Sequence, residues 1–250
     1  MTAVPDSVPP PTATRRYPFS RRRIGAMLLG VFLIGVAVGL FRQAALGTDP
    51  FTTMNVGVSS LIGWEFAFYQ VVFNIGLLGV VLITDRRHIG LGSLFNMVLV
   101  GYISTAVLIV LYILSDVPIM PDYTLMWVRV VTLGIAVLLA CLGVALYMTA
   151  QLGVGPYDAL ARIISDATGG RLSFRTCRIM TDTLAVLIGG TTFYLSGGHV
   201  PAIVGAGTLI MALGTGPLVQ FFIDRVAMPW LHRDVPPMPA ASPRPISVKE

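Results

Sequence analysis

Long apolar segments are the feature that most constrains how this chain folds. Six such runs follow one another, at about residues 24–46, 66–83, 91–114, 125–149, 179–195 and 201–223. Each is long enough to cross the ~30 Å hydrocarbon core of a bilayer as a helix, which takes roughly 17–25 residues. Soluble domains do not contain so many long runs, and the chain is 55% hydrophobic and only 12% charged. The sequence therefore predicts an all-α membrane protein with six transmembrane helices.

The two ends of the chain differ from its apolar middle. Residues 1–20 and 224–250 are rich in proline and have no apolar periodicity. Such segments bury too little apolar surface to offset the entropy cost of ordering them. We therefore expect a disordered N-terminal tail, a six-span transmembrane domain over residues 21–223 and a proline-rich cytoplasmic tail at the C-terminus. The first apolar run is longer than the core of a secretory signal and has no clear cleavage site, so we expect it to be retained as a span.

The distribution of positive charge predicts the orientation of the spans. Lys and Arg residues resist translocation and remain in the cytoplasm. With the N-terminus inside, every Lys and Arg except Arg42 and Arg129 falls on the cytoplasmic side. The sequence therefore predicts a multi-pass protein of the bacterial cytoplasmic membrane with both termini in the cytoplasm.

A short motif occurs twice and divides the transmembrane domain into two similar halves. Leu46–Phe51 reads Leu-Gly-Thr-Asp-Pro-Phe, and Leu152–Tyr157 reads Leu-Gly-Val-Gly-Pro-Tyr. Later in each half, a Gly-x-Gly segment followed by Ser or Thr begins at Gly90 and again at Gly205. Matches that recur in the same order indicate an internal duplication.

Each copy of the duplication holds three spans. Repeat 1 covers about residues 24–114 and repeat 2 about residues 125–223. An odd number of spans inserts the second repeat upside down relative to the first, which is the inverted-repeat plan of many secondary transporters. We expect the first copy of the motif to face the outer side and the second to face the cytoplasm. The Gly-x-Gly segments are expected to let neighbouring helices approach closely.

Each copy of the motif has the composition of a broken helix. Glycine permits non-helical backbone, and proline is well tolerated at the first position of a new helix. The predicted helix-break residues are Gly47, Asp49, Pro50, Gly153, Gly155 and Pro156. The short helices that follow, over about residues 50–62 and 156–168, are either re-entrant segments that face a substrate path or interfacial helices that only connect spans. A re-entrant helix would aim its free N–H groups and positive dipole end at the break, which suits an anion.

Five polar side chains in or near the spans are candidates for a substrate or ion path. They are Asp158, Arg178, Asp182, Gln70 and Asn74. Asp158 lies in the first turn after the second break, where it either caps the helix or binds a proton or cation. Arg178 and Asp182 are one helical turn apart, so they form a structural ion pair or take part in a coupling path. Gln70 and Asn74 align with them in the repeat and either complete one polar site or form hydrogen bonds between helices.

Several segments in both halves match a known pattern. They are Leu46–Pro50, Gly90–Asn96, Leu152–Leu160, Arg175–Asp182, Gly205–Leu209 and Gly214–Gln220. In these segments the chain resembles the YczE/YyaS/YitT family of bacterial integral membrane proteins, over about residues 25–223. The family has a glutamate where Asp182 stands here, so the negative charge is kept. The resemblance implies a multi-span architecture similar to that of transporters, and it implies no particular biochemical activity.

The leading functional hypothesis is a transporter or permease-like protein that moves a small solute between the two repeats. The alternative is a non-enzymatic membrane scaffold or accessory factor for a partner enzyme or exporter. We expect that the protein is not an enzyme, because the spacing of its polar residues brings no nucleophile, base and orienting group together. We expect no cofactor and no metal site, since the histidines are isolated and the two cysteines are far apart. The expected contacts are the lipid bilayer and a small-molecule substrate, with a protein partner or a second copy of the chain left open, and no nucleic acid is expected.

Overall fold

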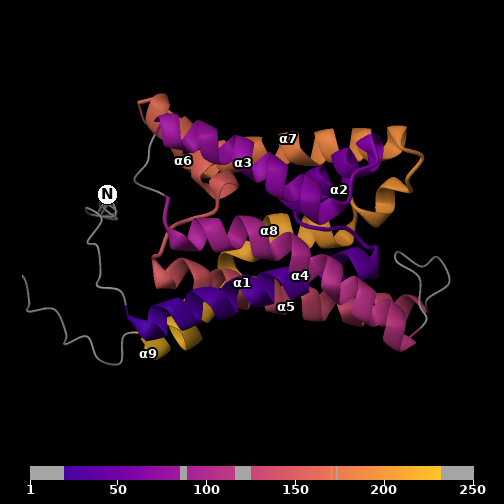
Figure 1. The fold of residues 1–250 in the computed structure, drawn as a ribbon, viewed down its shortest axis with the longest axis horizontal. Coiled ribbons are helices and arrows are strands. Elements are labelled where there is room, and N and C mark those ends of the chain that lie inside the picture. The colour runs from indigo at the N-terminus through magenta and orange to yellow at the C-terminus, as the bar shows by residue number, and fades with distance from the viewer. Residues whose placement is uncertain (1–19, 85–88, 116–124, 170, 173, 232–250) are drawn as a thin grey trace, which may run out of the picture.

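The computed structural model describes residues 20–84, 89–115, 125–169, 171–172 and 174–231, and these ranges contain helices and no strand (Figure 1). Most of both predicted tails lies outside the described residues. The helices are α1 (Arg21–Ala44), α2 (Pro50–Ile62), α3 (Phe66–Thr84), α4 (Leu91–Ser115), α5 (Met126–Ala150), α6 (Pro156–Ala167), α7 (Phe174–Leu195), η2 (Val200–Ala202), α8 (Ala206–Phe222), η3 (Ile223–Ala227) and α9 (Met228–Leu231).

Five stretches of the described chain are long and apolar enough to cross a membrane. They are Arg21–Ala44, Phe66–Thr84, Leu91–Leu114, Met126–Ala150 and Val200–Leu231. These stretches correspond to five of the six predicted spans. The remaining predicted span, residues 179–195, lies in α7, which has 22 residues but carries Arg178 and Asp182 in its first half. That α7 also crosses the membrane stays a prediction.

The outer surface of the bundle is strongly apolar. Leu114 on α4 and Leu213 on α8 are 78% and 73% exposed, and many other large apolar side chains also point outward. An apolar surface of this extent is unusual for a soluble monomer and is the surface that lipid covers.

The most extensive contact between two helices of the described chain is that of α1 with α5. A Cβ atom placed on Gly30 of α1 would lie 2.7 Å from the backbone oxygen of Gly143, and one placed on Gly143 of α5 would lie 2.8 Å from the oxygen of Gly30. These glycines let the two backbones touch, which is a common basis of helix packing in lipid.

The other helices form contacts that correspond between the two halves of the chain. α4 packs on α1, and α8 packs on α5. α2 packs on α7, and α6 packs on α3 as well as on α7. Figure 1 shows α2, α3, α6 and α7 above α1, α4, α5 and α8. The helical chain then continues through η3 and α9 to Leu231, into the segment predicted as the C-terminal tail.

Candidate functional site

The two copies of the repeated motif have the same backbone conformation. The first residue after α1 and the first after α5 are left-handed, with φ of 51° at Ala45 and 53° at Gln151. Two residues later the backbone again has positive φ, 102° at Gly47 and 113° at Gly153. Glycine adopts this conformation without steric cost. In both copies a short helix then begins at a proline, Pro50 for α2 and Pro156 for α6, as the sequence predicts.

The first break is bound to the segment that starts α8. Three backbone hydrogen bonds connect them: Gly47 N–H to Ala202 O (3.1 Å), Thr48 N–H to Ile203 O (3.0 Å) and Gly207 N–H to Leu46 O (2.7 Å). The Thr53 hydroxyl adds a hydrogen bond to Ile203 O at 3.1 Å. We call this contact the first clasp.

The second break is bound to the start of α4 in the same way. Gly92 donates its backbone N–H to Leu152 O at 2.8 Å, and the Ser93 hydroxyl donates to Val154 O at 2.6 Å. A Cβ atom on Gly90 would lie only 2.1 Å from Leu152 O, so glycine is required for this approach. In this second clasp, as in the first, the break of one half is held by the Gly-x-Gly segment of the other half.

The two short helices begin at the same place in the bundle. Phe51 follows Pro50 on α2 and Tyr157 follows Pro156 on α6, and their ring centroids are 4.6 Å apart. Phe73 of α3 lies beside them, with its ring centroid 6.2 Å from that of Phe51. In Figure 1, α6 lies toward the left end of the bundle and α2 toward the right. We call the meeting point of these two N-terminal ends the helix tips.

A network of charged side chains lies at the helix tips. Arg178 of α7 donates from Nη1 to Asp158 Oδ1 at 2.5 Å and from Nε to Asp182 Oδ2 at 3.0 Å. The Tyr157 hydroxyl donates to Asp182 Oδ1 at 2.7 Å. The side chains of Arg178, Asp158 and Asp182 are 33%, 51% and 24% exposed. The network therefore joins the start of α6 to the first half of α7 while remaining accessible.

Asp49 brings a further carboxylate to the helix tips. It caps α2 by accepting the backbone N–H of Thr52 at 3.0 Å. Asp182 and Arg178 are near enough to act on it electrostatically. Among the described residues Asp49 forms no ion pair, in contrast to Asp158 and Asp182.

The structure places the predicted site residues in three groups. Asp158, Arg178 and Asp182 form the network, and the helix-break glycines and prolines hold the clasps and start the short helices. Gln70 and Asn74 are buried on α3, at 4% and 2% exposure. No hydrogen bond among the described residues joins either amide to the network, so their membership of one polar site stays a prediction.

Sequence reasoning did not single out the aromatic contact or two buried polar groups. Phe51 and Tyr157 each directly follow the proline of their motif. This shared position was the one feature of the sequence that pointed to their contact. Asn55 Oδ1 and the Tyr147 hydroxyl are buried without a hydrogen-bond partner among the described residues. Nothing in the sequence around either residue marks it as unpaired.

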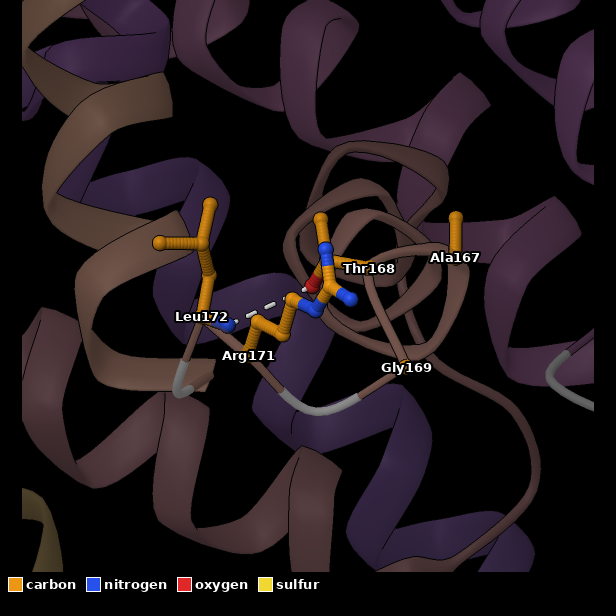
Figure 2. Close-up of a pocket in the computed structure, with 5 residues that line it drawn as sticks. All are labelled: Ala167, Thr168, Gly169, Arg171 and Leu172. Carbon is orange, nitrogen blue, oxygen red and sulfur yellow. Dashed lines mark hydrogen bonds between the residues drawn. The ribbon is translucent and has the colours of Figure 1, made fainter.

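The open hollow shown in Figure 2 lies away from the helix tips. It is lined by Ala167, Thr168, Gly169, Arg171 and Leu172, in the corner between α6 and α7. The backbone N–H of Leu172 donates to the Thr168 hydroxyl at 3.4 Å. This hydrogen bond joins the two sides of the turn between α6 and α7. Within the described ranges, no three His, Cys, Asp or Glu side chains are grouped so that they could hold a metal ion.

Comparison with known proteins identifies the family. Residues 21–224 match a family described as a family of unknown function, DUF6198. The chain belongs to this family. An uncharacterized protein of Haemophilus influenzae is 26% identical over 215 residues, which is 86% of this chain and 89% of that protein.

Two Bacillus subtilis proteins are also similar to this DUF6198 chain. The uncharacterized membrane protein YczE is 24% identical over 78% of this chain and 83% of its own length, and the uncharacterized protein YyaS is 23% identical over 82% and 94%. These names confirm the family that the sequence resembles. No solved structure matches. The apolar helices and these similarities together show a multi-pass membrane protein of unknown function.

Proposed function

We propose that this protein is a transporter of a small solute in the bacterial cytoplasmic membrane. The observation that carries the proposal is the contact of two short helices at their N-terminal ends, with the rings of Phe51 and Tyr157 in contact beside the Arg178 network. Broken helices that meet in the middle of a bundle are the usual construction of solute sites in secondary transporters.

An inverted repeat of three spans in each half fits the observed contacts. Both breaks have the same backbone, and each is bound by the Gly-x-Gly segment of the other half. The packing of α4 on α1 corresponds to that of α8 on α5, and the packing of α2 on α7 corresponds to that of α6 on α3. With both termini in the cytoplasm, the first clasp faces outward and the second faces the cytoplasm.

The exposure of the network supports a path that contains water. Charged groups at membrane depth are costly in hydrocarbon and usually face water, a partner or the bundle interior. Irregular backbone such as the two breaks is likewise tolerated only where protein or a water-filled cavity covers it. The path would run past the helix tips, with the first clasp closing its outer end and the second clasp closing its cytoplasmic end.

Transport is tested with purified protein in proteoliposomes. Currents on solid-supported membranes and uptake of labelled solutes are measured for amines, amino acids, sugars and organic acids. We expect at least one class to be transported and Asp182→Asn to lower that transport by at least about tenfold, because the variant loses charge-assisted hydrogen bonds. Asp166→Asn is the matched control, since Asp166 is an exposed residue near the far end of α6.

The same preparation tests the alternative of a scaffold or accessory factor. Crosslinking in cells followed by mass spectrometry would recover a stoichiometric partner of a scaffold. A partner of that kind, together with no flux of any solute class, would contradict the transport proposal.

A further inference from the structure

The helix tips hold more carboxyl groups than cationic side chains. Three carboxylates lie in this region, those of Asp49, Asp158 and Asp182, and Arg178 forms ion pairs with the last two. Asp49 has no ion pair within the described ranges, although Asp182 and Arg178 act on it. A carboxylate at membrane depth that has no counter-charge is costly, and a bound cation would lower that cost.

Each positive helix end at the tips has a carboxylate of the chain beside it, and that of Asp49 also accepts a helix N–H. Asp49 accepts the Thr52 N–H in the first turn of α2, and Asp158 lies in the first turn of α6. A helix N-terminus attracts anions, but a carboxylate in the first turn already interacts with the helix dipole and repels a second anion. The two carboxylates therefore make the meeting point of the two N-termini less favourable for an anionic ligand.

Asn55 independently points to a ligand that donates hydrogen bonds. Its side chain is fully buried, and its Nδ2 donates to Phe51 O at 2.8 Å, so the amide lies back along α2 toward the tip. Its Oδ1 is an acceptor with no donor among the described residues. Buried acceptors are nearly always paired, so an unpaired one beside the tip calls for an incoming donor.

Tyr147 supplies a second unpaired group on the α6 side. Its hydroxyl is buried without a partner, and Asp158 is near enough to act on it electrostatically. The edge of its ring lies 3.2 Å from a Cβ placed on Gly92, at the second clasp. The unpaired hydroxyl therefore lies close to the first turn of α6.

The aromatic side chains at the tips suit the body of an organic cation. The guanidinium of Arg178 lies 5.0 Å from the centroid of the Tyr157 ring, so this ring already accommodates a cation on its face. Aromatic faces attract ammonium groups as well as guanidinium groups. The acidic residues of the described chain form no group that could hold a metal ion.

We infer that the helix tips bind a small organic ammonium ion. Its charged head is held by Asp49 and Asp182 and donates to Asn55 Oδ1, while its apolar body lies against Phe51 and Tyr157. The inference rests on the proposed function, because it names the substrate class of the same site.

The test measures binding to the purified full-length protein in nanodiscs by isothermal titration calorimetry. The probes are benzylammonium, its neutral counterpart benzyl alcohol and the anion benzoate. We expect saturable binding of benzylammonium and binding of the other two weaker by at least about tenfold, since they lack the positive charge. Tighter binding of benzoate, or no saturable binding of benzylammonium, overturns the inference.

Asp49→Asn is the decisive variant. Asparagine caps a helix about as well as aspartate, so the variant removes the charge while keeping the cap of α2. We expect it to weaken benzylammonium binding by at least about tenfold and Asp166→Asn to leave binding unchanged. Affinity that remains within about twofold in Asp49→Asn overturns the inference. If Asp49→Asn does not fold, Asp182→Asn takes its place with the same two outcomes.

The binding and transport experiments distinguish failure of the inference from failure of the proposed function. Benzylammonium binding without flux of any solute would contradict the proposed function and leave the inference standing. Flux of an anionic or neutral solute without benzylammonium binding would contradict the inference and leave the proposed function standing.

Discussion

The first clasp predicts a large difference between two glycine-to-alanine substitutions. Gly47 has φ of 102°, and a Cβ atom there would lie 2.6 Å from Gly205 N and 2.8 Å from Thr208 Oγ1. Gly63, at the end of α2, also has positive φ, 70°, but nothing lies within 4 Å of its Cβ position. Gly63→Ala therefore carries the backbone cost alone, and Gly47→Ala carries that cost plus a clash with the clasp.

The expected magnitudes follow from these two environments. A non-glycine residue in left-handed backbone costs about 1–2 kcal/mol. At Gly47 the added methyl costs about 1–3 kcal/mol more through overpacking, and the shift weakens the 2.7 Å bond from Gly207 to Leu46, worth about 1 kcal/mol. Gly47→Ala should thus lose about 2–4 kcal/mol more unfolding free energy than Gly63→Ala.

Unfolding in mixed micelles, followed by circular dichroism as denaturing detergent is added, measures both variants against the natural protein. The comparison removes much of the backbone cost, because both glycines have positive φ; φ of 102° at Gly47 lies further from the left-handed helical region than 70° at Gly63, which adds to the larger loss expected for Gly47→Ala. Equal losses in the two variants would refute the argument that the first break is held tightly against α8.

Two further substitutions test other contacts by the same unfolding measurement. Gly57→Ala should cost about 1–3 kcal/mol, because its Cβ would lie 2.1 Å from Gly189 O and would push α2 from α7. Gly76→Ala on α3 is its control and should cost nothing, since that position is open; equal effects would contradict close packing of α2 on α7. Tyr157→Phe keeps the ring and removes the hydrogen bond to Asp182, so it should cost about 1 kcal/mol, whereas an unchanged unfolding free energy would show that this bond contributes nothing.

Local signals made much of the fold predictable from the sequence. The proline after each break fixed where α2 and α6 begin, and the apolar runs located the long helices to within a few residues. The spacing of Arg178 and Asp182 predicted a shared helix face, and the structure places them in an ion pair. These features depend on neighbouring residues along one helix, which periodicity reports directly.

Contacts between distant segments were not predictable in the same way. The pairing of Asp158 with Arg178 depends on how α6 packs against α7, and the contact of Phe51 with Tyr157 depends on how the two halves are arranged. The motif showed that both breaks exist, but not that each is bound by the other half. Such contacts are decided by tertiary packing, for which a single sequence carries no periodic signal.

Labelling of a cysteine at the helix tips shows whether a solute path containing water passes this point. Tyr157→Cys is made with Cys141→Ala and Cys177→Ala, and a membrane-impermeant thiol reagent is added to either face of sealed vesicles. The natural protein, whose Cys141 and Cys177 are both buried, gives the background. A path that opens alternately to the two sides predicts labelling of position 157 from both faces. A folded protein that is labelled from neither face would have a dry interface at the helix tips and would contradict the account.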